Sequence, residues 1–239
     1  IEYLSASNWL FRAETYYKHF ENLIPLNQGE QVTEGNDQVS TTPFNEFFDT
    51  RAFAYGLELL FKKTAGKSRG WIGYTYAKTM KHIQKHGWYH PKYDRTHTLN
   101  IVGDYTVPFF KNLHFNYAVQ ASSGQPFTPP IGRYNHFEAY HDPIKSDLYQ
   151  NEQFLVGEKN ADRLPIYFRL DLGLKQKKSL FGFPYERYLQ LINVTNHVNT
   201  LSYQYRAKEN RLTGETLGLE RAAVPMFPFF FTVGYRIEL

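Results

Sequence analysis

Residues 51–63 read RAFAYGLELLFKK, and this stretch decides the fold class of the chain. Every second residue from Phe53 to Phe61 is large and apolar, and the positions between them include Gly56 and Glu58. Side chains of a β-strand point alternately to opposite faces, so the pattern predicts a strand with one apolar and one more polar face.

Seven further segments show the same alternation, which predicts an all-β protein. With the first stretch they cover residues 8–19, 51–63, 70–81, 96–107, 113–123, 166–175, 188–205 and 229–239. The facing of segment 188–205 is ambiguous, because its apolar residues fall on both sides. The segments are long enough to cross a bilayer, for which a tilted strand needs roughly 9–11 residues.

The predicted connections alternate between short and long along the chain. The short ones are residues 64–69, 108–112 and 176–187, and the long ones are residues 20–50, 82–95 and 124–165. Short turns on one side and long loops on the other are typical of outer-membrane barrels, in which the short turns face the periplasm. A water-soluble sandwich also has alternating strands, but it has no reason to sort its loops in this way.

The composition agrees with a membrane barrel. The chain has 239 residues, no Cys and a formal net charge of +4, and Tyr, Phe and Trp make up 18% of it. Many of these rings lie near segment ends, as the aromatic girdles of a barrel require. The longest nearly apolar run, residues 224–235, is shorter than a spanning helix. Lys and Arg form no basic stripe, so nucleic acid is not an expected partner. Together these features predict a transmembrane antiparallel up-and-down β-barrel with about eight strands in this chain.

Six stretches carry a more specific signal. They are residues 54–60 (AYGLELL), 70–78 (GWIGYTYAK), 93–100 (YDRTHTLN), 123–128 (SGQPFT), 163–172 (RLPIYFRLDL) and 193–196 (NVTN). In this order they resemble the C-terminal part of TonB-dependent outer-membrane receptors of the Bacteroidota type. The resemblance implies that residues 1–239 form the last part of a 22-stranded barrel, whose plug domain and earlier strands lie outside this stretch. Closure of the eight strands into a small ring of their own stays open as the alternative.

The same resemblance implies a function in the bacterial outer membrane. Such a receptor takes up a large, scarce solute, for example a metal chelate, a cobalamin or an oligosaccharide, and this chain would supply barrel wall and extracellular loops. The implied partners are lipid and lipopolysaccharide, the plug domain, a periplasmic TonB-type energy coupler and, in some systems, a surface lipoprotein. No enzymatic activity and no cofactor is implied. The alternative is a structural barrel that anchors or scaffolds a larger surface complex.

Two sets of residues are the candidates for function. Rings and cations in the predicted extracellular loops could stack on a flat or sugar-like ligand, or simply pack on one another: Trp88, Tyr89, His90, Phe127, Arg133, Tyr134 and His136. Charged residues on the polar faces of the strands are expected to face the lumen, where they contact the plug or remain wetted: Arg12, Glu58, Asp104, Arg169, Asp171 and Arg236.

Catalytic and metal-binding signals are weak. The chain has no G-x-S-x-G, H-E-x-x-H, phosphate-binding or dinucleotide motif, so no catalytic residue is predicted. His97 could pair with Asp94, as could His141 with Asp142. His82, His86 and His90 recur every four residues and would line one face of a helix as a metal site, but Gly87 and Pro91 oppose a helix there.

Overall fold

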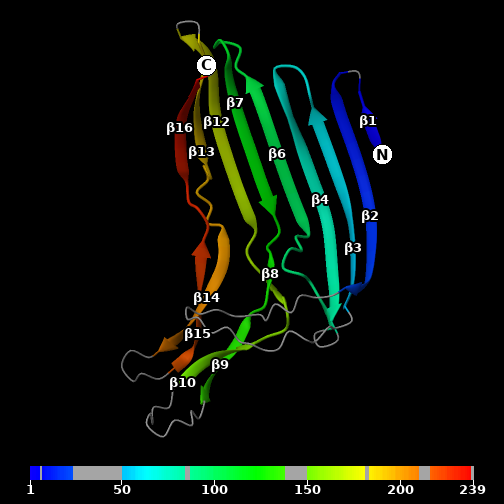
Figure 1. Cartoon of the computed structure of the whole chain (residues 1–239), viewed down its shortest axis with the longest axis vertical. Coiled ribbons are helices and arrows are strands. Elements are labelled where there is room, and N and C mark those ends of the chain that lie inside the picture. Colours follow the sequence, from blue (N-terminus) through cyan, green and yellow to red (C-terminus); the bar gives the residue numbers. More distant parts are fainter. Residues whose placement is uncertain are drawn as a thin grey trace.

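The computed structural model describes residues 1–5, 7–23, 50–83, 87–137, 150–180, 183–209 and 216–237. Every regular element in these ranges is a β-strand, which confirms the all-β prediction (Figure 1). No helix in the described ranges is long and apolar enough to cross a membrane.

One antiparallel sheet dominates the molecule. Its strands follow the order β1-β2-β3-β4-β6-β7-β12-β13-β16, and β5 pairs with the end of β4. The strands are β1 (Glu2–Leu4), β2 (Trp9–Leu23), β3 (Thr50–Lys63), β4 (Ser68–Ile83), β5 (Gly87–Tyr89), β6 (His97–Thr106), β7 (Leu113–Ser122), β12 (Tyr167–Leu180), β13 (Phe183–Ile192) and β16 (Phe230–Ile237). Neighbours in the sheet follow one another along the chain, which is an up-and-down arrangement.

Three smaller pairs of strands lie in the long connections. They are β8 (Pro126–Phe127) with β11 (Asp162–Arg163), β9 (Pro130–Phe137) with β10 (Gln150–Val156), and β14 (Thr200–Glu209) with β15 (Thr216–Pro225). All three lie at the end of the main sheet that is lowest in Figure 1, whereas the opposite end carries the short connections. We call these two ends the loop edge and the turn edge.

The structure corrects two predicted boundaries. Residues 176–187 do not form a connection, because β12 and β13 pair continuously from Leu172 with Leu191 to Leu180 with Phe183. Residues 188–205 do not form one strand either. Asn193 follows β13 in a left-handed conformation with φ of 53°, which ends the strand, and the chain then enters the separate β14–β15 hairpin. The mixed facing of segment 188–205 therefore reflects two strands that belong to different sheets.

The register places the alternating apolar residues on one continuous face. Directly paired residues carry this face across the sheet from β2 to β12 in one row: Phe11, Phe61, Ile72, Ile101, Val119 and Leu170. A second row runs from β6 to β16: Tyr105, Phe115, Leu174, Leu189 and Val233. We call this side of the sheet the apolar face.

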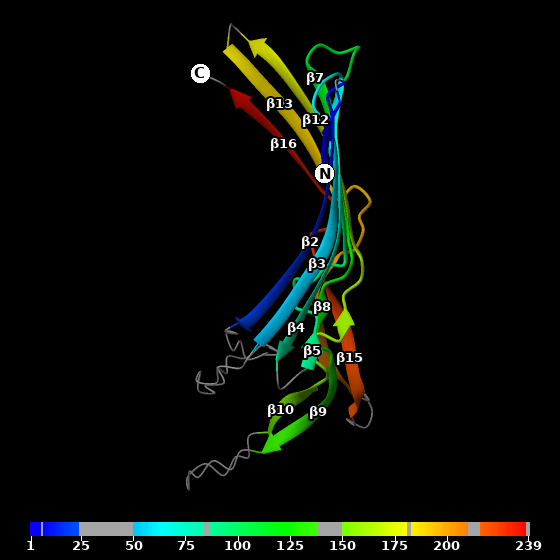
Figure 2. The same cartoon turned by 90° about the vertical axis from the view of Figure 1, so that its right-hand side faces the viewer.

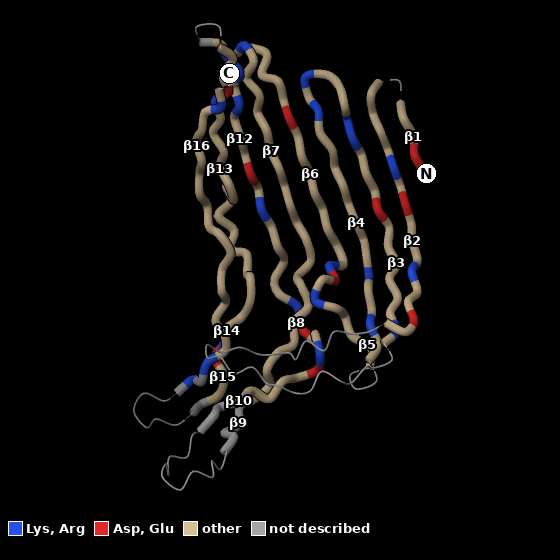
Figure 3. The backbone as a smooth tube through the Cα atoms, viewed as in Figure 1, with Lys and Arg blue, Asp and Glu red and all other residues tan. Residues whose placement is uncertain are grey.

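All six charged candidates of the strands lie on the opposite side, the polar face. The pairings Glu14 with Glu58, Asp104 with Asn116, and Glu186 with Arg236 follow from the same register. Arg12, Arg169 and Asp171 share that side by the period of two. Charged residues of both signs are spread over the strands rather than gathered in one stripe (Figure 3).

The sheet has almost no protein core of its own. In the described strands of the main sheet, Ala52 and Ile83 are the only buried hydrophobic side chains, and Pro91 and Pro126 are buried in the long connections. On the apolar face Phe61 and Ile72 remain 41% and 43% exposed, and Tyr235 is 75% exposed. Figure 2 shows the main sheet edge-on as a single curved layer, in which β2, next to the short edge strand β1, and β16 at the other edge bend to the same side. The apolar face is therefore a large surface without a protein cover among the described residues.

Candidate functional site

The loop edge is organised around the buried carboxylate of Asp94. Its side chain is 1% exposed and receives three donors. The backbone N–H of Thr79 lies 2.7 Å from Oδ1, Arg163 Nη2 lies 2.6 Å from Oδ2, and His90 Nδ1 lies 3.1 Å from Oδ2. His90 Nδ1 is also 3.1 Å from the carbonyl oxygen of Thr79, so both of its neighbours are acceptors and this nitrogen carries the proton.

Arg163 joins two long connections at this point. Its Nη1 donates to the carbonyl oxygens of Asp94 and Gly124, each at 3.1 Å. Nearby, Arg95 donates to Ser122 at 2.8 Å, and the hydroxyl of Ser123 accepts the backbone N–H of His97 at 2.7 Å. Three of the stretches that carry the family resemblance, residues 93–100, 123–128 and 163–172, therefore meet in space around one carboxylate.

Gly124 is required by this close packing. A Cβ atom added there would lie 1.5 Å from the carbonyl oxygen of Leu164. The backbone N–H of Leu164 in turn donates to the carbonyl oxygen of Gln125 at 2.9 Å. The backbones of the two connections thus touch directly, which no other residue than glycine permits at this position.

A second polar node fixes the connection between β13 and β16. Asn193 is 1% exposed, and its side-chain amide donates to the carbonyl oxygens of His197 and Phe227 at 3.1 and 3.3 Å. Its backbone N–H donates to Asp171 Oδ1 at 2.9 Å. Asn199 bonds both backbone groups of Phe168 at 2.8 Å. Asp171, which also pairs with Arg169, therefore anchors a turn as well as lining the polar face.

Aromatic and charged side chains cluster where the small hairpins approach one another. The ring of Tyr203 lies 5.3 Å from that of Phe127, and the guanidinium of Arg221 lies 4.2 Å from the Tyr203 ring centre. Arg221 is also 3.7 Å from Asp162. Partial burial raises the pKa of the neighbouring Tyr205, against the lowering effect of its hydrogen bond from Arg221. These rings are partly exposed and offer flat surfaces at the loop edge.

The structure does not bring the predicted ligand-binding residues together in one site. Trp88 pairs with His82 across β4 and β5, and its ring contacts Phe53, so it belongs to the apolar face. Tyr89 pairs with Lys81 on the other side and has Lys159 Nζ 5.0 Å from its ring centre. His90 belongs to the Asp94 node, and Phe127 to the Tyr203 cluster. Arg133, Tyr134 and His136 lie in β9, but their side chains are outside the described residues.

The geometry does not support two roles considered for the histidines, a His–Asp pair and a metal site on a helix. His97 Nδ1 lies 2.8 Å from the hydroxyl of Tyr74, and Asp94 is held by His90 and Arg163, so the pair of His97 with Asp94 is not formed. His82 and His90 do not share a helix, because His82 lies in β4. His86, His141 and Asp142 are outside the described residues. No group of three or more His, Asp or Glu residues in the described ranges is arranged to hold a metal ion.

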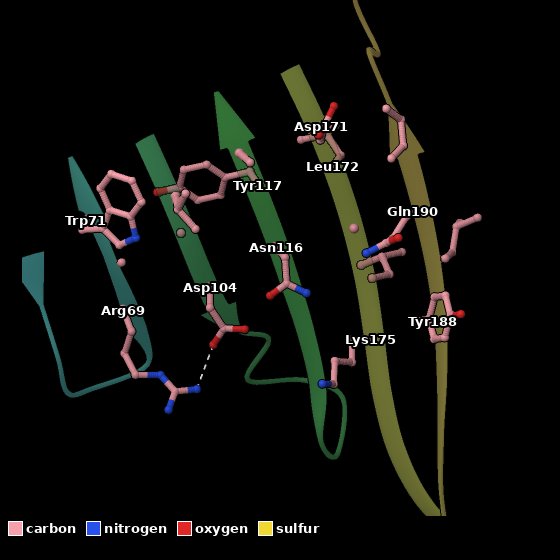
Figure 4. A pocket seen from close by; sticks show the side chains of 18 of the residues that line it. Arg69, Trp71, Asp104, Asn116, Tyr117, Asp171, Leu172, Lys175, Tyr188 and Gln190 are labelled. Atoms are coloured by element: carbon pink, nitrogen blue, oxygen red, sulfur yellow. Dashed lines mark hydrogen bonds and ion pairs between the residues drawn. The ribbon is translucent and has the colours of Figure 1, made fainter. Parts of the chain in front are cut away.

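A hollow of about 840 Å³ lies on the polar face toward the turn edge. Figure 4 shows its side chains on β4, β6, β7, β12 and β13, with Arg69 reaching Asp104. That ion pair is 2.8 Å long, and His114 Nδ1 lies 3.2 Å from the same carboxylate oxygen. Lys175 pairs with Glu186 at 2.9 Å. The hollow therefore presents fixed charges and amides, which suit a polar protein surface better than an apolar ligand.

Sequence reasoning missed Arg163, Tyr203 and Arg221 as members of the loop-edge clusters. Arg163 lies in one of the six stretches, but nothing in the sequence links it to Asp94, which is 69 residues away. Tyr203 and Arg221 gave no local signal, because they are brought to Phe127 by a hairpin that the sequence pattern did not reveal.

No family model, no curated protein and no solved structure matches the chain. The likeness to TonB-dependent receptors therefore rests on six short stretches. All six are connected in space. Leu59 pairs with Tyr74 across β3 and β4, and Tyr74 contacts His97. Arg163 bonds both Asp94 and Gly124, and Asp171 accepts the backbone N–H of Asn193.

Proposed function

We propose that this chain is part of the wall of an outer-membrane β-barrel and that its apolar face contacts lipid. The single observation that carries the proposal is a continuous, exposed apolar face on a one-layer sheet that buries only two apolar core residues in its described part. Burying a Leu, Ile or Phe side chain contributes about 1.5–3 kcal/mol, so a sheet of this size is not stable in water with that face uncovered.

The distribution of charge on the apolar face favours lipid over a second protein layer as the cover. From residue 99 to 105 of β6, 113 to 121 of β7 and 168 to 174 of β12, the side chains on this face are uncharged. Charged residues return only toward the strand ends, for example Lys63 and Lys178 at the turn edge and Lys78 at the loop edge. A bilayer has an uncharged centre and two charged surfaces, and this pattern matches it.

Strand length supports the same proposal. β2 has 15 residues and β4 has 16, whereas strands of globular proteins usually have five or six. At about 3.3 Å per residue, β4 extends for roughly 50 Å, enough to cross the hydrocarbon at a tilt and to project beyond it. Because lipid cannot satisfy a free strand edge, the sheet must be completed by further strands. We propose a 22-stranded ring that the chain forms with other strands of the same receptor.

Uptake of a large, scarce solute is the function that we propose for this barrel. The loops, which are joined by hydrogen bonds and ion pairs, and the rings at the loop edge would contact a metal chelate, a cobalamin or an oligosaccharide. The polar face would contact a plug domain that a periplasmic TonB-type coupler moves. A surface lipoprotein is a further proposed partner. None of these roles requires catalysis or a cofactor. The second candidate is a structural barrel in the same membrane, favoured by the network that ties the long connections together.

Energy-dependent uptake separates these two functions. Cells that lack the gene are compared with wild-type cells for uptake of radiolabelled iron chelates, cobalamin and oligosaccharides, each with and without a protonophore. The receptor reading predicts that one solute class enters only cells that have the gene, and that the protonophore stops entry but leaves surface binding. If uptake of all three classes is unchanged while a surface lipoprotein loses its attachment, the scaffold reading is correct.

A further inference from the structure

Two cations stand together on the apolar face at the turn edge. Lys178 in β12 pairs with Tyr185 in β13, and Gln176 pairs with Arg187, so Lys178 and Arg187 are diagonal neighbours on one side of the sheet. Such neighbours lie roughly 7–8 Å apart, within the reach of two long side chains. Both residues are exposed.

The guanidinium of Arg187 is held in place by a neutral partner. Its Nε and Nη2 donate to Gln176 Oε1 at 3.1 and 2.6 Å, and Gln176 Nε2 donates to the carbonyl oxygen of Lys111 at 3.0 Å. Gln176 itself is buried. A guanidinium has five N–H groups, so three of them remain for an anion. The full positive charge is preserved, because an amide does not neutralise it.

The cations on the other side of the same strands behave differently. Lys175 and Lys177 lie 2.9 and 3.9 Å from the carboxylate of Glu186 on the polar face. By contrast, no carboxylate within the described residues forms an ion pair with Lys178 or Arg187. Both lysines on the polar face of this hairpin therefore have a carboxylate partner, whereas neither cation on the apolar face has one among the described residues.

The surroundings of the two cations are those of a lipid headgroup region. Tyr235 pairs with Arg187 and is 75% exposed, and Tyr185 lies beside Lys178. The apolar residues Leu174, Leu189 and Val233 follow on the same face toward the middle of the strands. Tyrosine rings and long basic side chains at the end of an apolar band occupy the level of the phosphates.

We propose that Lys178 and Arg187, with the Gln176 amide as support, bind the phosphate group of an anionic phospholipid in the leaflet at the turn edge. The proposal rests on the proposed function, because it needs lipid on the apolar face. The phosphate accepts hydrogen bonds from the free N–H groups of Arg187. The ammonium of Lys178 attracts it as a point charge. The acyl chains then lie over Leu174, Leu189 and Val233, of which Leu174 and Val233 are 41% and 67% exposed and Leu189 is half-buried.

Quenching by brominated lipids tests this site. The native full-length protein, carrying a bimane label on a cysteine that replaces Leu189, is placed in vesicles of phosphatidylcholine with a fixed fraction of phosphatidylglycerol. Bromine is carried by one lipid or the other, and the ratio of the two quenching constants gives the preference for phosphatidylglycerol next to the probe. The variants are Lys178→Gln, Arg187→Gln with Lys178→Gln, and Lys177→Gln as the matched control from the polar face.

We expect a clear preference for phosphatidylglycerol in the parent, reduced roughly fivefold for each cation lost from the apolar face. Lys178→Gln keeps the bond between Arg187 and Gln176 and should give an intermediate ratio, while Lys177→Gln should leave the ratio unchanged. Equal quenching by both lipids in the parent would overturn the site, as would an equal loss in the control. Absence of quenching by either lipid would instead overturn the proposed contact between this face and the bilayer.

Discussion

The main sheet and the loop edge are stabilised by opposite means. In the sheet, side chains repeat by type, and exchange of one apolar residue for another preserves the face on which it lies. At the loop edge, single polar side chains such as those of Asp94 and Asn193 are buried and fully bonded. The stability of the main sheet therefore depends on the alternation of apolar and polar side chains, whereas the stability of the loop edge depends on individual residues. Substitutions should therefore have different effects in the two regions.

The largest effect is expected at the ion pair of Asp94 and Arg163, in which the carboxylate is buried and the guanidinium is 31% exposed. Asp94→Ala removes the partner of Arg163 and of the Thr79 N–H, and loss of one member of a buried pair costs about 3–5 kcal/mol. Hydrogen exchange should then accelerate in residues 123–128 and 162–165, which the pair connects. Glu220→Ala is the control, because its exposed contact with Arg206 lies outside these segments and should contribute less than about 1 kcal/mol. Unchanged exchange in the Asp94 variant would contradict the role of this node.

In the main sheet, the effect of a substitution on stability should depend on the face to which the side chain points. Ile101 and Asn100 are neighbours in β6 at the same depth but point to opposite faces. Ile101→Arg should lower the free energy of unfolding in bilayers by about 2–4 kcal/mol, because it places a charge in hydrocarbon. Asn100→Arg should change it little. Urea unfolding in vesicles measures both, and equal costs would show that the two faces meet the same medium.

An intermediate effect is expected for the asparagine turn. Asn193→Ala leaves the carbonyl oxygens of His197 and Phe227 without a donor, which costs about 1–3 kcal/mol for buried groups. Protease cleavage between residues 193 and 229 should become faster. The exposed Thr195→Ala is the comparison in the same turn, and cleavage that is equally fast in both variants would argue against a special role of Asn193.

The smallest effect is expected for the ion pairs of the polar face. Arg69 and Asp104 form a 2.8 Å contact that is partly exposed. Asp104→Asn should therefore lower the free energy of unfolding by less than about 1 kcal/mol, as for other solvated pairs. Urea unfolding again provides the measurement. A loss above 2 kcal/mol would mean that this carboxylate is covered by a further part of the protein.

Sequence alone could predict the strands of the main sheet but little of the loop edge, because strands have a local pattern and the loop edge depends on contacts between distant residues. Alternation over residues 51–63 or 113–123 is a local property, and the structure confirms strands there. The end of the apolar alternation predicts a connection over residues 176–187, yet pairing between β12 and β13 extends the strand to Leu180. Trp88 looked like a loop ring, but its place beside Phe53 depends on the β4–β5 pairing.

The Asp94 node shows the limit of local reasoning most clearly. Asp94 and Arg163 are 69 residues apart in the chain and meet only when β6, β7 and β12 lie side by side. Their motifs could be noticed as separate stretches, but no periodicity indicates that they form one ion pair. Long-range polar contacts of this kind have no signature in a single sequence.

The most direct test of the central claim is a cysteine scan through β6, residues 97–106, in the full-length protein in vesicles. Each cysteine carries an environment-sensitive fluorophore, which is exposed in turn to a lipid-borne nitroxide quencher and to a water-soluble one. We predict that residues 99, 101 and 105 are quenched only by the lipid-borne agent and residues 98, 100 and 104 only from water. Protection of residues 99, 101 and 105 from both quenchers would contradict the claim, since it would place the apolar face against protein.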